Sequence, residues 1–225
     1  MLKLFKYSLI ASAVVLAGCK VEAELEATHS ELFSETQHEK IGSLYVEVAG
    51  CKHYEDSRQE SDSLVKLKEA IQKYLPSTEY VECFSKKMDS FAHFKIPYAV
   101  GGKTSDIFEN IKVTAIPSDP EGTSNQAAVM VTKKFKKALK DIKKENMMSN
   151  LKTSLSIKYQ NNSDDTIEMT PLSVWMDDTP IVIGNVDSPP KATAIFKLSE
   201  IHSEILTGDG EQQISIFLDG YTKKK

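Results

Sequence analysis

The first 18 residues constrain this chain most, because they have the pattern of an export signal that takes no part in the folded protein. Met1–Tyr7 contains two lysines and no acidic residue, and Ser8–Ala17 is a ten-residue, largely apolar segment. Ten helical residues rise about 15 Å, half of a hydrocarbon core of about 30 Å. Residues 1–18 are therefore expected to be a cleaved signal peptide and not a membrane-spanning helix.

The signal segment ends in Leu16-Ala17-Gly18-Cys19, which resembles the lipobox of bacterial lipoprotein precursors. The resemblance implies that Cys19 receives a diacylglyceryl thioether, that cleavage follows Gly18, and that the new amino group of Cys19 is acylated. Two or three chains together anchor a protein far more firmly than one chain does. The alternative is an ordinary cleaved signal followed by an incidental cysteine.

The residue after Cys19 bears on the location of the protein. In enteric lipoproteins an aspartate at this position means retention in the inner membrane, whereas this chain has Lys20. The resemblance therefore implies anchoring in the outer membrane of the bacterial envelope, with membrane lipid as the partner held through Cys19.

Cys51 and Cys83 remain once Cys19 is lipidated. An even pair of cysteines in an exported chain predicts a disulfide, because exported proteins meet an oxidising compartment. Closing a loop of about 32 residues contributes about 3–4 kcal/mol of stability in the chain-entropy account. Two free buried thiols are the alternative. The chain has no Cys-x-x-Cys pair, so thioredoxin-like chemistry has no support.

Val21–Ala27 alternates strictly between apolar residues and glutamates, a pattern typical of a β-strand with one buried face. The same segment is acidic enough to be a solvated tether between the lipid and the globule. A tether of about 20 residues would span roughly 25 Å on average, whereas a strand would hold the globule directly against the membrane. We favour the strand.

The rest of residues 19–150 predicts a small N-terminal α+β sheet domain that contains the disulfide. Apolar residues recur at helical spacing over Ser63–Leu75, Ser61 or Asp62 is a candidate cap, and Pro76 stops the helix. A longer helix is expected over Thr123–Met148. Strands are expected at Leu44–Val48, Glu79–Phe84, Phe91–Pro97 and Asn110–Ile116. The order β-α-β-β fits a sheet with helices on one face.

Residues 151–225 predict a C-terminal antiparallel β-sandwich of immunoglobulin-like architecture. The short β runs in this part are Leu151–Tyr159, Thr166–Met169, Leu172–Met176, Ile181–Ile183, Ala192–Leu198 and Gln213–Leu218. Turn residues separate these runs at the spacing typical of sandwiches. The cysteine pair of antibody domains is absent, and Trp175 is a candidate core anchor.

A lysine-rich face is the most unusual surface feature of the longer helix. Its lysines are Lys133, Lys134, Lys136, Lys137, Lys140, Lys143 and Lys144. They suggest contact with an anionic partner such as phospholipid headgroups, lipopolysaccharide or peptidoglycan. Near an anionic membrane each lysine contributes about 1 kcal/mol. The alternative, which we favour, is a solvated helix face balanced by acidic residues elsewhere.

Residues with metal or catalytic chemistry are scattered. The histidines are His29, His38, His53, His93 and His202, and no two have the close spacing of a zinc-binding helix. The ring of His93 should face away from Ala92 and Phe94, its neighbours in a predicted strand. There is no Gly-x-Ser-x-Gly motif, and the segment at 101–104 lacks the first glycine of a phosphate loop. The sequence predicts no catalytic residue, no metal site and no cofactor besides the acyl groups.

Residues 16–97 also resemble a group of uncharacterised lipoproteins carried by phages and prophages. The resemblance rests on the lipobox, on Leu44–Val48, and on the stretches 51–58, 80–83 and 86–97. It implies no established activity. Some prophage lipoproteins block receptors or DNA injection by other phages, so superinfection exclusion is a hypothesis by analogy.

Together these features predict a non-enzymatic, lipid-anchored binding protein whose partner is an envelope protein or peptidoglycan. A net charge of −4 and the envelope location argue against nucleic acid. The main alternative is an envelope enzyme, such as a cell-wall hydrolase, with no recognisable motif. A structural lipoprotein that oligomerises through exposed strand edges is a third hypothesis.

Overall fold

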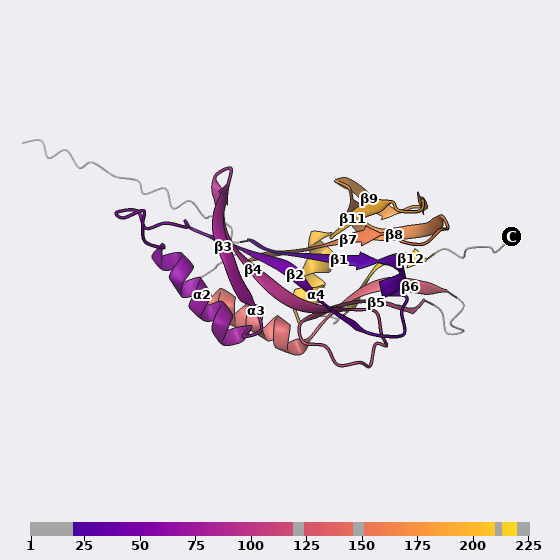
Figure 1. The fold of residues 1–225 in the computed structure, drawn as a ribbon, viewed down its shortest axis with the longest axis horizontal. Coiled ribbons are helices and arrows are strands. Elements are labelled where there is room, and N and C mark those ends of the chain that lie inside the picture. Colours follow the sequence, from indigo (N-terminus) through magenta and orange to yellow (C-terminus); the bar gives the residue numbers. More distant parts are fainter. Residues whose placement is uncertain (1–19, 119–123, 146–150, 210–212, 220–225) are drawn as a thin grey trace, which may run out of the picture.

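Strand β1 (Lys20–Thr28) lies within a single twelve-stranded sheet, and both of its edges are paired. The computed structural model describes residues 20–118, 124–145, 151–209 and 213–219. It is mostly β, with 51% strand and 20% helix, and nine of the strands form a closed barrel (Figure 1). The expected lipobox and signal peptide lie outside the described residues.

The barrel takes strands from both sides of residue 150. Its members besides β1 are β2 (His38–Val48), β4 (Asp89–Val100), β5 (Ile111–Pro117), β6 (Asn125–Val131), β7 (Lys152–Gln160), β8 (Ile167–Met176), β11 (Thr193–Leu198) and β12 (Gln213–Asp219). The order around the wall is β8-β11-β7-β1-β2-β4-β5-β6-β12, and pairing of β12 with β8 closes the ring. Strand β3 (Glu79–Lys86) extends the sheet beside β4, while β9 (Thr179–Ile183) and β10 (Val186–Ser188) pair with β8.

The core lies inside the barrel and is covered by helices. Helices α2 (Asp62–Tyr74), α3 (Lys133–Glu145) and α4 (Glu200–Thr207) contribute buried side chains to the core, and the one-turn helix α1 (His29–Leu32) follows β1. Apolar side chains of α3 and α4 meet those of β1 and β2 around a void of about 20 Å³. That volume is near the smallest that holds one water molecule. At this place the interior is therefore packed and leaves no chamber for a ligand.

The expected fold class, an α+β domain followed by an immunoglobulin-like sandwich, is wrong. Strand β1 pairs antiparallel with β2 and parallel with β7, from Lys20↔Lys152 to Thr28↔Gln160. Strands from the two expected parts therefore share one barrel and one core. Alternation in β1 specifies which side chains are buried, but it does not specify which distant strands occupy its edges.

The helix expected over Thr123–Met148 is shorter than predicted. Strand β6 occupies Asn125–Val131, and α3 begins at Lys133 after the Thr132 hydroxyl accepts a hydrogen bond from the Phe135 N–H at 3.1 Å. β6 lies between β5 and β12, and three consecutive residues in it are fully buried. A short apolar run that is buried on both faces cannot be told from a helix by its periodicity.

Several local predictions agree with the structure. Helix α2 begins beside Ser61, whose hydroxyl accepts a hydrogen bond from the Leu64 N–H at 3.2 Å, and it ends just before Pro76. The alternating segment at the start is β1, with Leu25 and its apolar neighbours buried. Helix α4 and strand β10 were not predicted. Within the described ranges, none of the helices combines the length and the hydrophobicity needed to cross a membrane.

The side chain of Tyr98 in β4 bonds to the main chain of β1 at the point where β1 and β2 are no longer paired. Their ladder runs to Glu24↔Ser43, and beyond it the Tyr98 hydroxyl donates to the Glu26 carbonyl at 2.6 Å and accepts from the Glu26 N–H at 2.9 Å. Gly42 leaves the room for this arrangement, because a Cβ there would lie 3.3 Å from Cδ1 of Tyr98 and 2.8 Å from the Glu24 carbonyl oxygen.

We expect Tyr98→Phe to lower the free energy of unfolding by about 1–3 kcal/mol, because it removes the partner of two main-chain groups. Urea denaturation measures the difference. The control is Tyr54→Phe at an exposed site, which should change stability by less than about 0.5 kcal/mol. Equal unfolding midpoints for Tyr98→Phe and the unaltered protein would contradict this role for the hydroxyl.

Candidate functional site: a groove on the outer face of the barrel

The side chains that alternate with the core residues form the outer face of the barrel wall. One row crosses four strands, because Glu22 of β1 lies opposite Tyr45 of β2, Tyr45 opposite His93 of β4, and His93 opposite Glu82 of β3. The ring of His93 faces away from buried Ala92, as alternation predicted. Carboxylates and aromatic rings from distant parts of the sequence thus share one surface.

The first half of the groove, which we call the Tyr45 half, is an open pocket of about 520 Å³. The rings of Tyr45 and His93 stack with centroids 4.7 Å apart, and Phe84 meets Tyr45 edge-on at 6.0 Å. His93 Nε2 lies 3.0 Å from the Ser43 hydroxyl. Partial burial lowers the pKa of His93, and the nearby Glu82 carboxylate opposes this shift. The packed rings of Tyr45, His93 and Phe84 therefore form one side of the pocket, next to its charged side chains.

The second half, which we call the Trp175 half, is a pocket of about 510 Å³ on the other side of β1. The expectation that Trp175 anchors the core is wrong, because its side chain is 44% exposed on the outer face, opposite Lys197 in the neighbouring strand. The two halves share Lys20 and Glu22. The remaining charged side chains of this half are Lys152, Asp178, Glu200 and Glu204. We refer to the two halves together as the outer groove.

The composition of the outer groove indicates what it can bind. Aromatic rings pack against apolar faces of a ligand, while carboxylate and ammonium groups bond to hydroxyl, amide or charged groups. A concave surface that combines the two is typical of a binding site. The outer groove therefore suits an extended polar ligand such as a glycan strand or a peptide segment.

Lys20 fixes the start of β1 beside the Tyr45 half. Its main-chain N–H donates to the carboxylate of buried Glu47 at 3.0 Å, and its ammonium group bonds to Asp89 at 2.8 Å. Burial raises the pKa of Glu47, and the charge of Lys20 opposes that shift. The first residue after Cys19 is thus held by both its main chain and its side chain.

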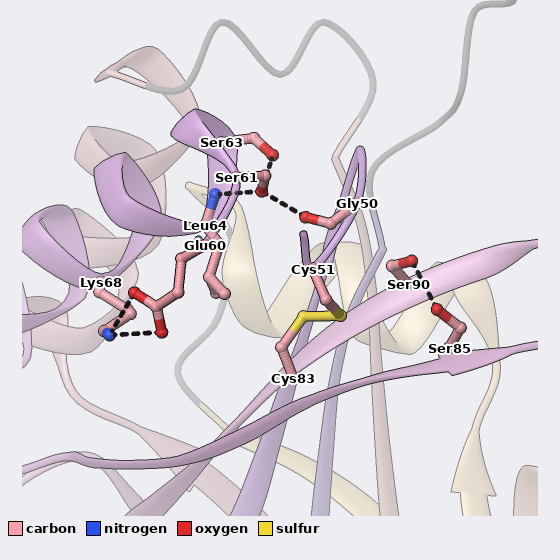
Figure 2. The surroundings of a disulfide bond; sticks show 10 residues. All are labelled: Gly50, Cys51, Glu60, Ser61, Ser63, Leu64, Lys68, Cys83, Ser85 and Ser90. Carbon is pink, nitrogen blue, oxygen red and sulfur yellow. Dashed lines mark hydrogen bonds and ion pairs between the residues drawn. A yellow bond between two sulfur atoms is a disulfide. The ribbon is translucent and has the colours of Figure 1, made fainter. Parts of the chain in front are cut away.

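The expected disulfide between Cys51 and Cys83 is present, and it ties the loop after β2 to strand β3 (Figure 2). The Cα atoms of the two cysteines are 5.5 Å apart. The same loop is closed by the Ser61 N–H, which donates to the Cys51 carbonyl at 3.2 Å, and by the Ser61 hydroxyl, which donates to the Gly50 carbonyl. The loop over residues 50–61 is therefore braced at both ends.

The lysines of α3 do not form one free cationic face. Lys136 is buried, with its ammonium group 3.5 Å from the Ile205 carbonyl oxygen. Lys134 pairs with Glu109 at 3.3 Å, and Lys140 pairs with Asp209. The other lysines are exposed or partly exposed, namely Lys133, Lys137, Lys143 and Lys144. Their contact with an anionic partner stays a prediction, and none of the seven lines the outer groove.

Sequence reasoning did not identify the outer groove. Alternation alone places Tyr45 on the face opposite Leu44 and Val46, so an outward aromatic residue was the available signal. The step from one such residue to a groove needs the strand register, which brings Tyr45 beside His93 and Phe84. In the part of the chain that the structure describes, no three His, Cys, Asp or Glu side chains are grouped to hold a metal ion.

A closed barrel with packed helices and an outer groove defines a β-barrel protein with a candidate site on its surface. The chain belongs to the family described as Domain of unknown function (DUF7424), whose model matches residues 21–224. No curated protein and no solved structure matches the chain.

We expect loss of the disulfide to lower the free energy of unfolding by about 3–4 kcal/mol, because a loop of 32 residues is no longer closed in the unfolded chain. Urea denaturation of the Cys51→Ser, Cys83→Ser double variant measures this loss. A reducing agent should destabilise the unaltered protein by a similar amount and leave the double variant unchanged. Coincident unfolding curves with and without reductant would contradict a stabilising disulfide.

Proposed function

We propose that this protein is a lipid-anchored binding protein of the bacterial envelope, held in the outer membrane by acyl chains on Cys19. The lipobox supports the anchor, and the observation that carries the proposal is the position of β1. Strand β1 begins at Lys20, the residue after Cys19, and Glu47 and Asp89 hold it there. An anchor at Cys19 therefore leaves no flexible tether between the bilayer and the barrel.

The outer groove is the binding site in this proposal. Lys20 lines both halves, so the groove begins next to the anchored residue and opens beside the membrane surface. Anchoring replaces a three-dimensional search with a high local concentration of sites at that surface. A glycan strand of peptidoglycan and an extended segment of an envelope protein both fit the mixture of rings and charges.

We expect the mature native protein to carry a diacylglyceryl group and an N-linked acyl chain on Cys19. Intact-mass spectrometry and incorporation of labelled palmitate measure both additions. The Cys19→Ser variant should incorporate no label and should leave the membrane fraction, because the acyl chains supply the membrane affinity. An unmodified thiol at Cys19 in the purified native protein would refute the anchor.

We expect Tyr45→Ala and Trp175→Ala each to weaken co-sedimentation with purified peptidoglycan sacculi about tenfold, which corresponds to about 1.4 kcal/mol of lost contact. The two substitutions test the two halves of the outer groove separately. Ile107→Ala, an exposed apolar position outside the groove, is the control and should bind as the unaltered protein does. If all three variants bind sacculi as the unaltered protein does, the outer groove is not the binding site. If the unaltered protein itself does not co-sediment, sacculi are not the partner, and cross-linking to envelope proteins becomes the next measurement.

The second candidate is an envelope hydrolase, and one observation favours it. The Tyr45 half brings His93 together with Glu22, Glu24 and Glu82, which are residue types used in general acid–base catalysis. Zymography on sacculi separates the two functions. Binding without release of soluble fragments supports the binding protein, whereas fragment release that is lost in Glu82→Gln supports the hydrolase.

A further inference from the structure

Two exposed loops lie at the end of the sheet where β1 begins. Val21 pairs with Val46, and Val48 at the end of β2 pairs with Ser90 at the start of β4. The β3–β4 turn and the loop after β2 therefore both extend from this end. Figure 1 shows the β3–β4 hairpin projecting beyond the body of the barrel.

The tip of the β3–β4 hairpin combines positive charge with an exposed apolar side chain. Lys86 and Lys87 are exposed, and Met88 is 99% exposed. The neighbouring carboxylate of Asp89 is bonded to Lys20 at 2.8 Å, so it is already neutralised. Within the described ranges, neither Lys86 nor Lys87 forms an ion pair with a carboxylate. Both lysines also line the Tyr45 half, whose carboxylates include Glu82. The tip therefore carries two lysines without an ion-pair partner in the described ranges, beside an apolar group.

The loop after β2 presents an aromatic residue at the same end. Tyr54 is 88% exposed, its ring stacks on His53 with centroids 5.0 Å apart, and its hydroxyl donates to Glu55 at 2.8 Å. Arg58 and Asp56 in this loop pair with each other at 2.9 Å. Tyrosine is enriched at membrane–water interfaces, because its ring is apolar and its hydroxyl is polar.

The disulfide makes the hairpin and the loop one unit. Cys51 precedes Tyr54 by three residues, and Cys83 lies on β3 just before the hairpin tip. The disulfide therefore links the loop to the hairpin strand, and β1 starts beside the hairpin, where Lys20 bonds to Asp89. Cys19, the proposed site of the anchor, directly precedes Lys20 in the sequence.

We infer that Lys86, Lys87 and Met88, together with Tyr54, form a rim that docks on the anionic phospholipid surface holding the acyl chains of Cys19. This inference rests on the proposed anchor. The lysines meet lipid phosphates, while Met88 and the ring of Tyr54 enter the interface. The anchor and the two tips then make three contacts with the bilayer, which orients the barrel and its outer groove.

A fluorescence measurement on the full, lipidated protein tests the rim. Met88→Cys introduces a thiol for an environment-sensitive dye, because Cys51 and Cys83 are joined and Cys19 carries lipid in the proposal. The control is Ile107→Cys, which is 93% exposed in the loop beyond the other end of β4, about 36 Å along the strand. Both proteins are placed in vesicles of phosphatidylethanolamine and phosphatidylglycerol that contain spin-labelled quencher lipids.

We expect the dye at position 88 to shift to the blue and to be quenched by the spin-labelled lipids, whereas the dye at position 107 keeps its emission in water. Replacing both Lys86 and Lys87 with Ala should lower the docked-to-undocked ratio about fivefold per lysine. The matched control, Lys133→Ala with Lys137→Ala on α3, removes two exposed lysines elsewhere and should leave the emission unchanged.

The possible outcomes distinguish failure of the proposed rim from failure of the proposed anchor. If the protein sediments with the vesicles but the dyes at positions 88 and 107 behave alike, the rim is wrong and the anchor stands. If Lys133→Ala with Lys137→Ala abolishes the blue shift and the rim variants do not, α3 is the docking surface and the rim is wrong. If the protein stays in the supernatant and Cys19 is unmodified by mass, both the anchor and the rim are refuted.

Discussion

The pairing of β1 on both edges is the interaction on which the rest of the structure depends. Antiparallel pairing with β2 and parallel pairing with β7 join the first and second halves of the chain into one wall. Without β1, the strands before residue 150 and those after it would meet only where β12 pairs with β6. The start of β1 is fixed in turn by Glu47 and Asp89, whose carboxylates bond to Lys20.

The same strand links the fold to the proposed function. Its apolar residues enter the core, and Glu22 and Glu24 between them line the outer groove. Its first residue lines both halves of the groove and directly follows Cys19, the proposed site of the anchor. The proposed anchor, the outer groove and the proposed rim are therefore adjacent, because each lies near the start of β1.

Local features of the fold could be predicted from the sequence. The alternation of Val21–Ala27 identified β1, a candidate cap at Ser61 or Asp62 identified the start of α2, and the even pair of cysteines identified the disulfide. Each of these depends on neighbouring residues or on the chemistry of the compartment. The Asn125–Val131 segment was misassigned, because consecutive residues in it are buried on both faces of the sheet and its pairing with β5 and β12 leaves no mark in its own pattern.

The barrel and the groove could not be predicted, because they depend on contacts between distant segments. Nothing in the local pattern of β1 indicates that Lys20 lies opposite Lys152. Tyr45 and Trp175 were visible as single aromatic residues, but only the strand register places them on one face beside β1. The lysine-rich helix is a case in which a local pattern gave a wrong position for a side chain. Its spacing predicted that Lys136 lies on an exposed polar face, whereas in the structure Lys136 is buried.

Hydrogen exchange of the lipidated protein in vesicles tests most directly whether the barrel is held without a tether. The account predicts that main-chain amides of Val21–Leu25 are protected as strongly as those of β2 and β7, because they belong to the same cooperative sheet. Exchange of these amides within seconds, while β2 and β7 stay protected, would show that the segment is a flexible linker and would contradict the account.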